Sequence, residues 1–140
     1  MNYFSAKIKF LHQTESGEIK RKSEEFLVSA STFIEAETNL LENLKDEIAE
    51  YQLTALSIKT FDDIFKSEYE LGERLFFKVV IALTTLDPDT SKESKVKSNS
   101  LIQAESTDEA TKKIKEIWSH SVSDWEIISI SQTKYVDVFI

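Results

Sequence analysis

The chain has 140 residues, of which 41% are hydrophobic and 30% are charged, and it contains no cysteine. This composition is typical of a globular protein that can bury a core, and it excludes disulfides, thiolate metal sites and cysteine nucleophiles. The net charge of −8 does not suit direct nucleic-acid binding, which needs clustered Lys and Arg. No apolar run approaches the roughly 20 residues of a membrane span, and we expect a cytoplasmic protein that does not contact membranes.

The first half of the chain predicts two strands, a helix and a third strand. Apolar and polar residues alternate over 4–10, which indicates a half-buried strand, and a second strand ends at 26–28. Thr32 and Glu35 form a capping box, the pattern that starts a helix. A third strand is expected at 53–59. The helix carries one apolar stripe, which consists of Phe33, Ala36, Leu40, Leu41, Leu44 and Ile48.

The second half predicts the same elements in the same order. Its first strand covers 77–84 and is followed by a turn at 87–89. Ser106 and Glu109 repeat the capping box, and a last strand is expected at 125–132. The apolar stripe of this helix consists of Ala110, Ile114, Ile117 and Trp118.

This order of elements indicates a duplicated unit. A shift of 74 residues places Thr32 on Ser106 and Tyr51 on Trp125. We therefore predict a first repeat at 1–66, a connector at 67–75 and a second repeat at 76–140, which together form one compact unit with pseudo-two-fold symmetry.

The predicted fold class is α+β, a tandem ββαβ repeat with a mainly antiparallel sheet and two helices packed on it. In each repeat the helix returns the chain, so the second and third strands run parallel and the first lies between them, in the order 2-1-3. The two repeats either pair edge to edge in a six-stranded sheet or stack.

The segments that follow the two third strands, 61–65 and 135–139, each keep an aromatic residue, an aspartate and a phenylalanine in step. One interpretation is an arm whose aromatic residues seal the core of the opposite repeat. The other is a pair of related ligand or partner sites at the seam between the repeats, with one carboxylate each. The candidate site residues are Phe61, Asp63, Phe65, Tyr135, Asp137 and Phe139.

Catalytic and metal-binding patterns do not emerge from the sequence. His12 and His120 occupy non-equivalent positions in the two repeats, and neither belongs to a spacing typical of metal ligands. The only glycines, Gly17 and Gly72, do not form a phosphate-binding loop. We therefore expect no enzyme activity, no cofactor and no metal.

Acidic residues gather on the first predicted helix and just after it. A solvated helix surface explains them, and the alternative is a mimic of nucleic-acid charge that occupies a basic host enzyme. The second helix carries Lys112, Lys113 and Lys115 on the equivalent face, which weakens the mimic. The acidic residues are Glu35, Glu37, Glu42, Asp46, Glu47 and Glu50.

Four stretches of the second half resemble a family of small duplicated proteins. They are 86–93 (LDPDTSKE), 101–104 (LIQA), 124–127 (DWEI) and 137–139 (DVF). That family occurs in gut-type bacteria and their phages and is known only as a domain of unknown function. The resemblance covers nearly the whole chain and implies a cytoplasmic protein associated with a phage or prophage. It implies no activity and no functional residues.

The expected function is a non-catalytic interaction module that binds a partner protein or a small ligand at the seam between the repeats. The alternatives are a structural or assembly protein of the virion, in which outer strands join copies of the chain, and the charge-mimic inhibitor. A homo-oligomer is compatible with each of these.

Overall fold

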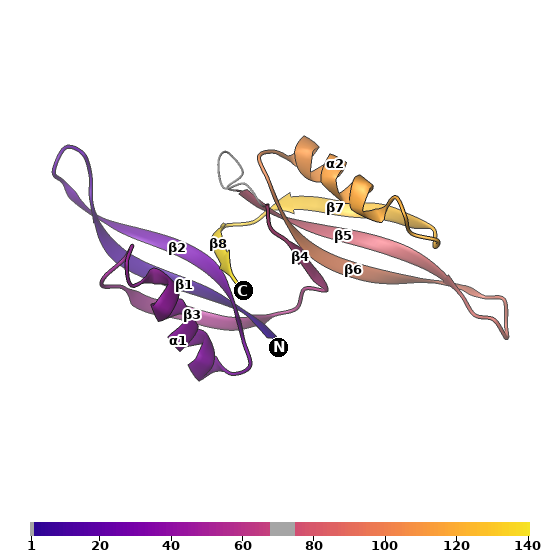
Figure 1. Cartoon of the computed structure of the whole chain (residues 1–140), viewed down its shortest axis with the longest axis horizontal. Coiled ribbons are helices and arrows are strands. Elements are labelled where there is room, and N and C mark those ends of the chain that lie inside the picture. Colours follow the sequence, from indigo (N-terminus) through magenta and orange to yellow (C-terminus); the bar gives the residue numbers. More distant parts are fainter. Residues whose placement is uncertain (1, 68–74) are drawn as a thin grey trace. The chain divides into compact units, whose positions relative to one another are not determined.

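The computed structural model describes residues 2–67 and 75–140, within which the chain forms eight strands and two helices (Figure 1). The chain divides into two compact units. Unit 1 comprises Met1–Thr60 and Lys134–Ile140, and unit 2 comprises Phe61–Thr133. The elements are β1 (Asn2–Gln13), β2 (Ile19–Ala30), α1 (Phe33–Leu44), β3 (Gln52–Lys59), β4 (Asp63–Phe65), β5 (Leu75–Leu86), β6 (Glu93–Ala104), α2 (Thr107–Trp118), β7 (Trp125–Gln132) and β8 (Tyr135–Phe139).

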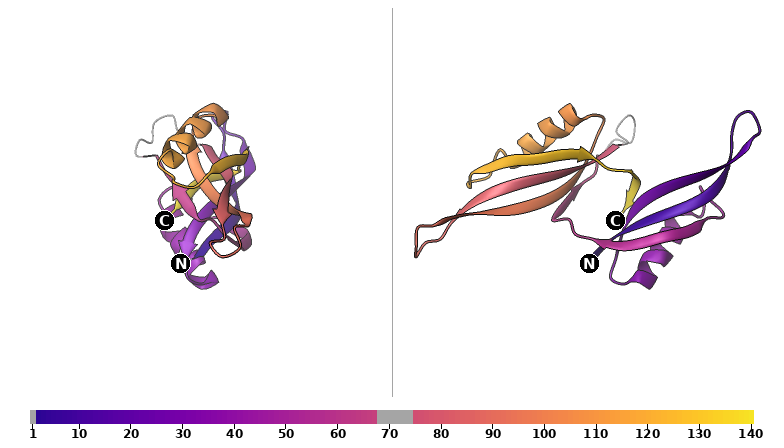
Figure 2. Two further views of the ribbon diagram at one scale, coloured as in Figure 1. Left: turned by 90° about the vertical axis from the view of Figure 1, so that its right-hand side faces the viewer. Right: turned by 180° about the vertical axis from the view of Figure 1, so that it is seen from behind.

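Each unit contains one mixed sheet of four strands and one helix on a face of that sheet (Figure 2). The strand order is β3-β1-β2-β8 in unit 1 and β4-β6-β5-β7 in unit 2. The α+β class is confirmed, and the predicted order 2-1-3 is present in each sheet. β1 is antiparallel to β2 and β3, and β5 is antiparallel to β6 and β7.

The prediction of three strands for each helix was wrong, because each sheet has a fourth strand that runs parallel to its neighbour. β8 pairs with β2 through Leu27↔Val138, and β4 pairs with β6 through Ile64↔Leu101. The segments 61–65 and 135–139, predicted as arms or ligand sites, contribute these strands. The structure thus has two four-stranded sheets in place of one sheet of six strands.

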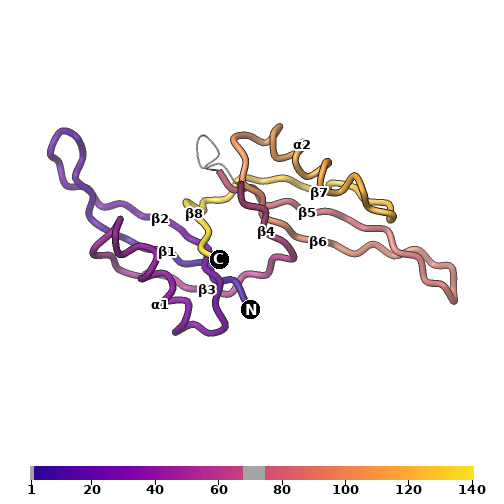
Figure 3. The backbone as a smooth tube through the Cα atoms, viewed as in Figure 1, coloured from indigo at the N-terminus to yellow at the C-terminus, as the bar shows by residue number. Residues whose placement is uncertain are grey.

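The fourth strands also determine which parts of the chain belong to which unit. β4 follows β3 in sequence but joins the sheet of unit 2, and β8 follows β7 but joins the sheet of unit 1 (Figure 3). Unit 1 is therefore built from two separate stretches of sequence. The predicted connector 67–75 lies outside the described residues at 68–74. The repeat bounds 1–66 and 76–140 stay a prediction about the sequence copies.

The core of unit 1 lies between α1 and the sheet. Leu40 and Leu44 of the helix are fully buried with Ala6 and Ile8 of β1, and Ala36 is fully buried in the cluster that contains Phe4. These positions alternate on the strand and recur every three or four residues on the helix, so both elements bury one apolar side. Phe26 of β2 completes this core and stacks on Phe139 of β8, with ring centroids 5.3 Å apart.

The core of unit 2 is built in the same way from α2 and its sheet. Ala110 and Ile114 of the helix are fully buried against Phe77, Val79 and Ile81 of β5. At the end of α2, Trp118 lies on Trp125, the first residue of β7, with ring centroids 6.3 Å apart. The tryptophan pair fills the space between the helix end and the outer strand.

Both helices begin at the hydroxyl residues that the capping boxes predicted. Thr32 Oγ1 accepts a hydrogen bond from Glu35 N at 3.1 Å, and Ser106 Oγ accepts one from Glu109 N at 3.2 Å. Each bond satisfies one of the backbone donors that a helix start leaves without a partner. The sequence therefore located both helix starts to the residue.

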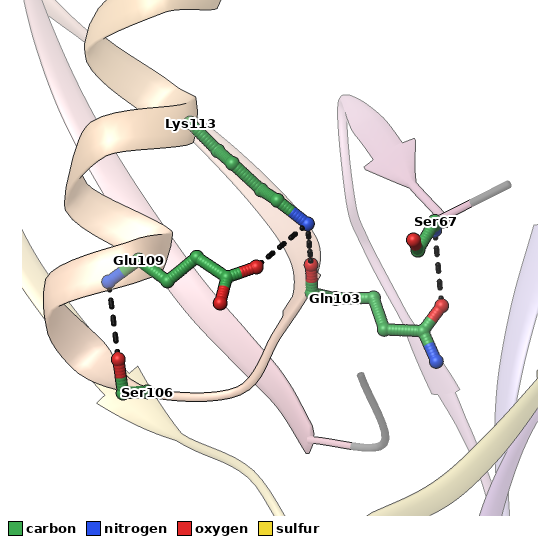
Figure 4. A network of polar contacts seen from close by, with 5 residues as sticks. All are labelled: Ser67, Gln103, Ser106, Glu109 and Lys113. Carbon is green, nitrogen blue, oxygen red and sulfur yellow. Dashed lines mark hydrogen bonds and ion pairs between the residues drawn. The ribbon is translucent and has the colours of Figure 1, made fainter. Parts of the chain in front are cut away.

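The start of α2 is held by a further polar network in unit 2 (Figure 4). Lys113 Nζ lies 3.1 Å from Glu109 Oε1 and donates to the backbone oxygen of Gln103 at 3.1 Å. The Gln103 side chain in turn accepts a hydrogen bond from Ser67 N at 3.0 Å. The network joins α2, the end of β6 and the residues that follow β4.

We expect Thr32→Ala and Ser106→Ala each to lower the free energy of unfolding by about 1 kcal/mol, because each removes the side-chain oxygen that caps a helix. Urea denaturation followed by circular dichroism measures this change. Ser31→Ala is the control, since Ser31 is an exposed bend residue and such surface changes stay within about 0.5 kcal/mol. Equal effects of Ser31→Ala and Thr32→Ala would contradict the capping role.

Candidate functional site

Unit 1 has an open groove of about 650 Å³ beside α1. We call it the α1–β3 groove because its lining joins the flank of the helix to the start of β3. Leu40, which is fully buried, and Leu53 contribute its apolar part. The complete lining is Glu37, Thr38, Leu40, Leu41, Ala49, Glu50, Tyr51 and Leu53.

The groove exists because α1 is displaced towards one side of its sheet. The backbone of α1 approaches β2 and β8 most closely, whereas the backbone of α2 approaches β6 and β7. β3 is the outer strand on the side away from β8. The helix therefore leaves the face of β3 less covered than the faces of β1 and β2.

The helix flank above the groove is apolar and exposed. Leu41 is 51% exposed, and Ile34, two helical turns earlier on the same side, is 79% exposed. The sequence placed Leu41 in one apolar stripe with Leu40, and the structure buries Leu40 but leaves Leu41 half exposed. Adjacent leucines point about 100° apart on a helix, so a stripe that includes both is wider than the surface that the sheet covers.

Two other members of the predicted apolar stripes are also partly exposed. Phe33 is 48% exposed, although its ring contacts Phe4 edge-on with centroids 5.0 Å apart. Ile117 of α2 is 41% exposed. Both lie at the margin of the apolar face, where a helix on a sheet turns towards solvent.

Carboxylates provide the polar part of the groove. Glu37 of α1 and Glu50, which immediately precedes Tyr51, are both exposed and line it. The lining contains no Lys or Arg. The groove thus combines an apolar surface with a negative charge that no basic lining residue offsets.

The apolar and acidic lining of the groove affects the ionisation of Tyr51. Partial burial of the phenol raises the pKa of Tyr51 above its ordinary value of 10.0, and the nearby negative charge of Glu37 raises this pKa further. Both causes favour the neutral phenol, so the hydroxyl stays a hydrogen-bond donor throughout the physiological pH range.

The contribution of Tyr51 to the free energy of unfolding should be fully present below pH 10.0, the ordinary pKa of the phenol. It should be lost as the pH rises through the higher pKa of the folded state. The sign follows because the unfolded chain loses the phenol proton first. Tyr51→Phe should therefore lessen the alkaline decline of the free energy of unfolding, measured by urea denaturation on both sides of this pH. An alkaline decline identical in Tyr51→Phe and wild type would contradict the raised pKa.

A second hollow of about 410 Å³ adjoins the groove in unit 1 and shares Ala49 and Glu50 with it. It is lined by the end of β1 and the segment after α1. Leu11, on its wall, is 69% exposed. The lining consists of Phe10, Leu11, His12, Gln13, Glu47, Ile48, Ala49 and Glu50.

Unit 2 carries different side chains at the positions 74 residues after those of the groove. Trp125 stands in place of Tyr51 and contacts Trp118, so an indole pair occupies the space between helix and outer strand. Lys115 stands in place of Leu41 and is exposed. Unit 2 keeps one carboxylate, Asp124 in place of Glu50, but has Thr111 in place of Glu37. The combination of an exposed leucine with two carboxylates therefore belongs to unit 1.

Of the candidate residues predicted from the sequence, Phe61, Asp63 and Phe65 lie in unit 2. Phe65 packs against the core of that unit, whereas Asp63 is exposed. The neighbouring Asp62 makes the stronger contacts: its Oδ2 accepts from Asn99 N at 2.7 Å, and its own N–H donates to Asn99 O at 2.7 Å. These bonds place the start of β4 beside β6.

Tyr135, Asp137 and Phe139 lie in unit 1. Phe139 packs against Phe26, and Asp137 Oδ1 accepts from the backbone N–H of Val138 at 2.7 Å. Burial is the main cause that raises the pKa of Tyr135, and the phenol also hydrogen-bonds the Ser5 side chain. The aromatic residues at 65 and 139 thus have packing roles, and binding by the six residues at a seam stays a prediction.

The histidines and the possible metal ligands add no second site. His12 lines the second hollow and is exposed, and His120 is exposed after α2. Within residues 2–67 and 75–140, no three His, Asp or Glu side chains gather closely enough to hold a metal ion. In the same residues no helix has the length and apolar character that crossing a bilayer requires.

Comparison with known proteins gives a family. Residues 2–140 match the family model described as Domain of unknown function (DUF4494). The chain belongs to this DUF4494 family. Comparison of this DUF4494 chain with the curated proteins and with the solved structures gave no match. The α1–β3 groove therefore rests on the geometry of this chain alone.

Proposed function

We propose that the protein is a non-catalytic interaction module that binds a partner protein through the α1–β3 groove of unit 1. The observation that carries this proposal is the exposure of Leu41 and Ile34 beside a concave lining that contains Glu37 and Glu50. Apolar side chains held beside a groove are a common feature of protein-binding surfaces. The carboxylates give such a surface selectivity for a basic partner.

The openness of the site favours a protein over a small ligand. The groove and the second hollow share Ala49 and Glu50 in their linings and lie along α1, β1, β3 and the segment between α1 and β3. A small molecule is usually enclosed on most sides. An exposed surface of this kind suits a segment of a partner that lies along it.

The test compares proteins retained from natural host extracts by the tagged wild type and by the double variant Glu37→Lys with Glu50→Lys. We expect a stoichiometric partner that wild type retains and the double variant loses. Binding of this partner should also weaken with added salt, since salt screens the charges of Glu37 and Glu50. The control is Glu15→Lys, which reverses an exposed charge outside both hollows. A partner retained equally by all three proteins would contradict the groove.

A structural role is the second candidate, and one observation favours it. β3 and β7 are outer strands of their sheets within the described residues. Outer strands present backbone groups that can pair with another copy of the chain. Light scattering over a range of concentrations tests this candidate, which predicts large assemblies.

We also propose that the chain arose by duplication of a single unit. Three features support this proposal: the matching element order, the hydroxyl caps Thr32 and Ser106, and a register shift at Lys7/Ile8 in one first strand and Val80/Ile81 in the other. The association with a phage or prophage, the cytoplasmic location and the charge-mimic alternative stay predictions from the sequence.

A further inference from the structure

The outer edge of β3 adjoins the α1–β3 groove. β3 has eight residues and pairs with β1 alone in the order β3-β1-β2-β8 of the described residues. The backbone N–H and C=O groups on its outer side therefore face away from the sheet. Such an edge accepts an extended segment through main-chain hydrogen bonds.

The side chains of β3 form an incomplete apolar layer on the helix side of the sheet. Register places Ile58 beside Phe4 of β1 and Leu53 beside Ile8. Phe4 and Ile8 are 1% and 0% exposed, whereas Ile58 is 51% exposed. Burial thus falls sharply from β1 to β3, although both strands present apolar residues to the same layer. One more strand beside β3 would cover these side chains.

The helix flank provides the other wall. α1 begins near the end of β3, because Phe33 contacts Phe4 and Phe4 pairs with Ile58. Ile34 therefore lies towards the end of β3, and Leu41 lies towards its start, where it lines the groove. An added strand would place alternate side chains beneath these two residues, because successive strand residues point to opposite faces.

We infer that the partner docks as an extended segment that adds to the outer edge of β3, with alternate apolar side chains in the groove and a Lys or Arg beside Glu37 and Glu50. This inference rests on the proposed function and specifies its binding mode. A docked helix would cover the apolar side chains but would leave the backbone edge of β3 unpaired. A strand satisfies both the edge and the apolar layer.

Charge indicates where along β3 the basic residue of the docked segment lies. Glu50 immediately precedes Tyr51 at the start of β3, and Glu37 lies close enough to influence the ionisation of Tyr51. Ile58 is exposed near the end of β3, and Ile34 is exposed in the first turn of α1. The basic residue of the partner is therefore expected over the start of β3, and its apolar residues over the end.

β7, the outer strand of unit 2 at the position equivalent to β3, does not offer the same binding site. Trp118 and Trp125 contact each other beside the end of α2, and Lys115 stands at the position equivalent to Leu41. A basic side chain there disfavours a basic partner. The inference therefore applies to β3 and not to β7.

The experiment selects binders from a library of randomised peptides of about ten residues, a length that spans β3. The intact protein is the target, and Leu41→Lys, which changes a half-exposed groove residue, is the counter-target. Circular dichroism verifies that the variant is folded. Each selected peptide is then synthesised in two forms, one N-methylated at even and one at odd positions. Affinities are measured by fluorescence anisotropy.

In strand addition, alternate N–H groups point towards β3 and away from it. We therefore expect one methylated form to keep its affinity and the other to lose at least about tenfold, equivalent to one main-chain hydrogen bond or more. Loss of binding by both forms indicates a helical peptide; it overturns the strand mode and leaves the groove as the binding site. If every peptide that binds wild type also binds Leu41→Lys, so that the counter-selection leaves no binder, the groove and the proposed function are overturned together.

Discussion

Deletion of residues 134–140 is expected to destabilise unit 1 by roughly 3–6 kcal/mol, because it removes β8 from the edge of β2. Val138 is 1% exposed, and Phe139 stacks on Phe26 in the core of that unit. Burial of each such side chain stabilises a fold by about 1.5–3 kcal/mol. A small domain has only about 5–15 kcal/mol of stability in total, so much of unit 1 should unfold at moderate urea concentrations.

The tryptophans allow this effect to be measured in one unit. Both tryptophans of the chain, Trp118 and Trp125, lie in unit 2. We expect the deletion to shift the urea transition seen by far-ultraviolet circular dichroism, which includes unit 1, and to shift the fluorescence transition less. The matched control removes Ile140 alone, which is 74% exposed and lies beyond β8. If the protein without residues 134–140 is as stable as the full-length protein, β8 does not complete the sheet.

Local patterns predicted most of the elements. Alternation located the first strand of unit 1, a nearly continuous apolar run located the first strand of unit 2, and the capping boxes located the starts of α1 and α2 at Thr32 and Ser106. These signals depend on residues a few positions apart, so they are present in a single sequence. The order 2-1-3 followed from strand direction and needed no long-range information.

The fourth strands were missed because their partners are distant in sequence. β8 pairs with β2, more than 100 residues earlier (Leu27↔Val138). Its burial does not alternate cleanly: Val138 is buried, while Tyr135, Asp137 and Phe139 are each partly buried. A segment of five residues without clear alternation looks the same in sequence whether it forms a strand or a packed arm. Only the completed sheet distinguishes the two.

The groove could be predicted only in part. The adjacent Leu40 and Leu41 show that the apolar stripe is too wide for one sheet face, and this signal was available in the sequence. Which leucine is buried depends on how far α1 is displaced towards β2 and β8, and that displacement is a property of the assembled unit. Glu50 precedes Tyr51 in the sequence, but the position of Glu37 near Tyr51 is a property of the fold.

The same two leucines give the sharpest test of the groove. Substitution of Leu40 should reduce mainly stability, and substitution of the adjacent Leu41 should reduce mainly binding. Leu40→Ala removes a fully buried side chain and is expected to lower the free energy of unfolding by about 2–5 kcal/mol. Leu41→Ala removes a half-exposed side chain and should change it by less than about 1 kcal/mol. Urea denaturation of both variants measures this difference.

Binding should be weakened more by Leu41→Ala than by Leu40→Ala. Leu41→Ala should weaken binding to a groove-selected peptide by about 1–2 kcal/mol, which corresponds to roughly 5–30-fold. Leu40→Ala, measured where it is still folded, should bind more nearly as wild type, since most of its side chain lies beneath the groove surface in the core. If Leu41→Ala costs as much stability as Leu40→Ala, the flank of α1 is covered within unit 1 and is not a binding surface. If Leu40→Ala lowers mainly stability and Leu41→Ala lowers mainly binding, then Leu40 packs in the core of unit 1 and Leu41 contacts the partner.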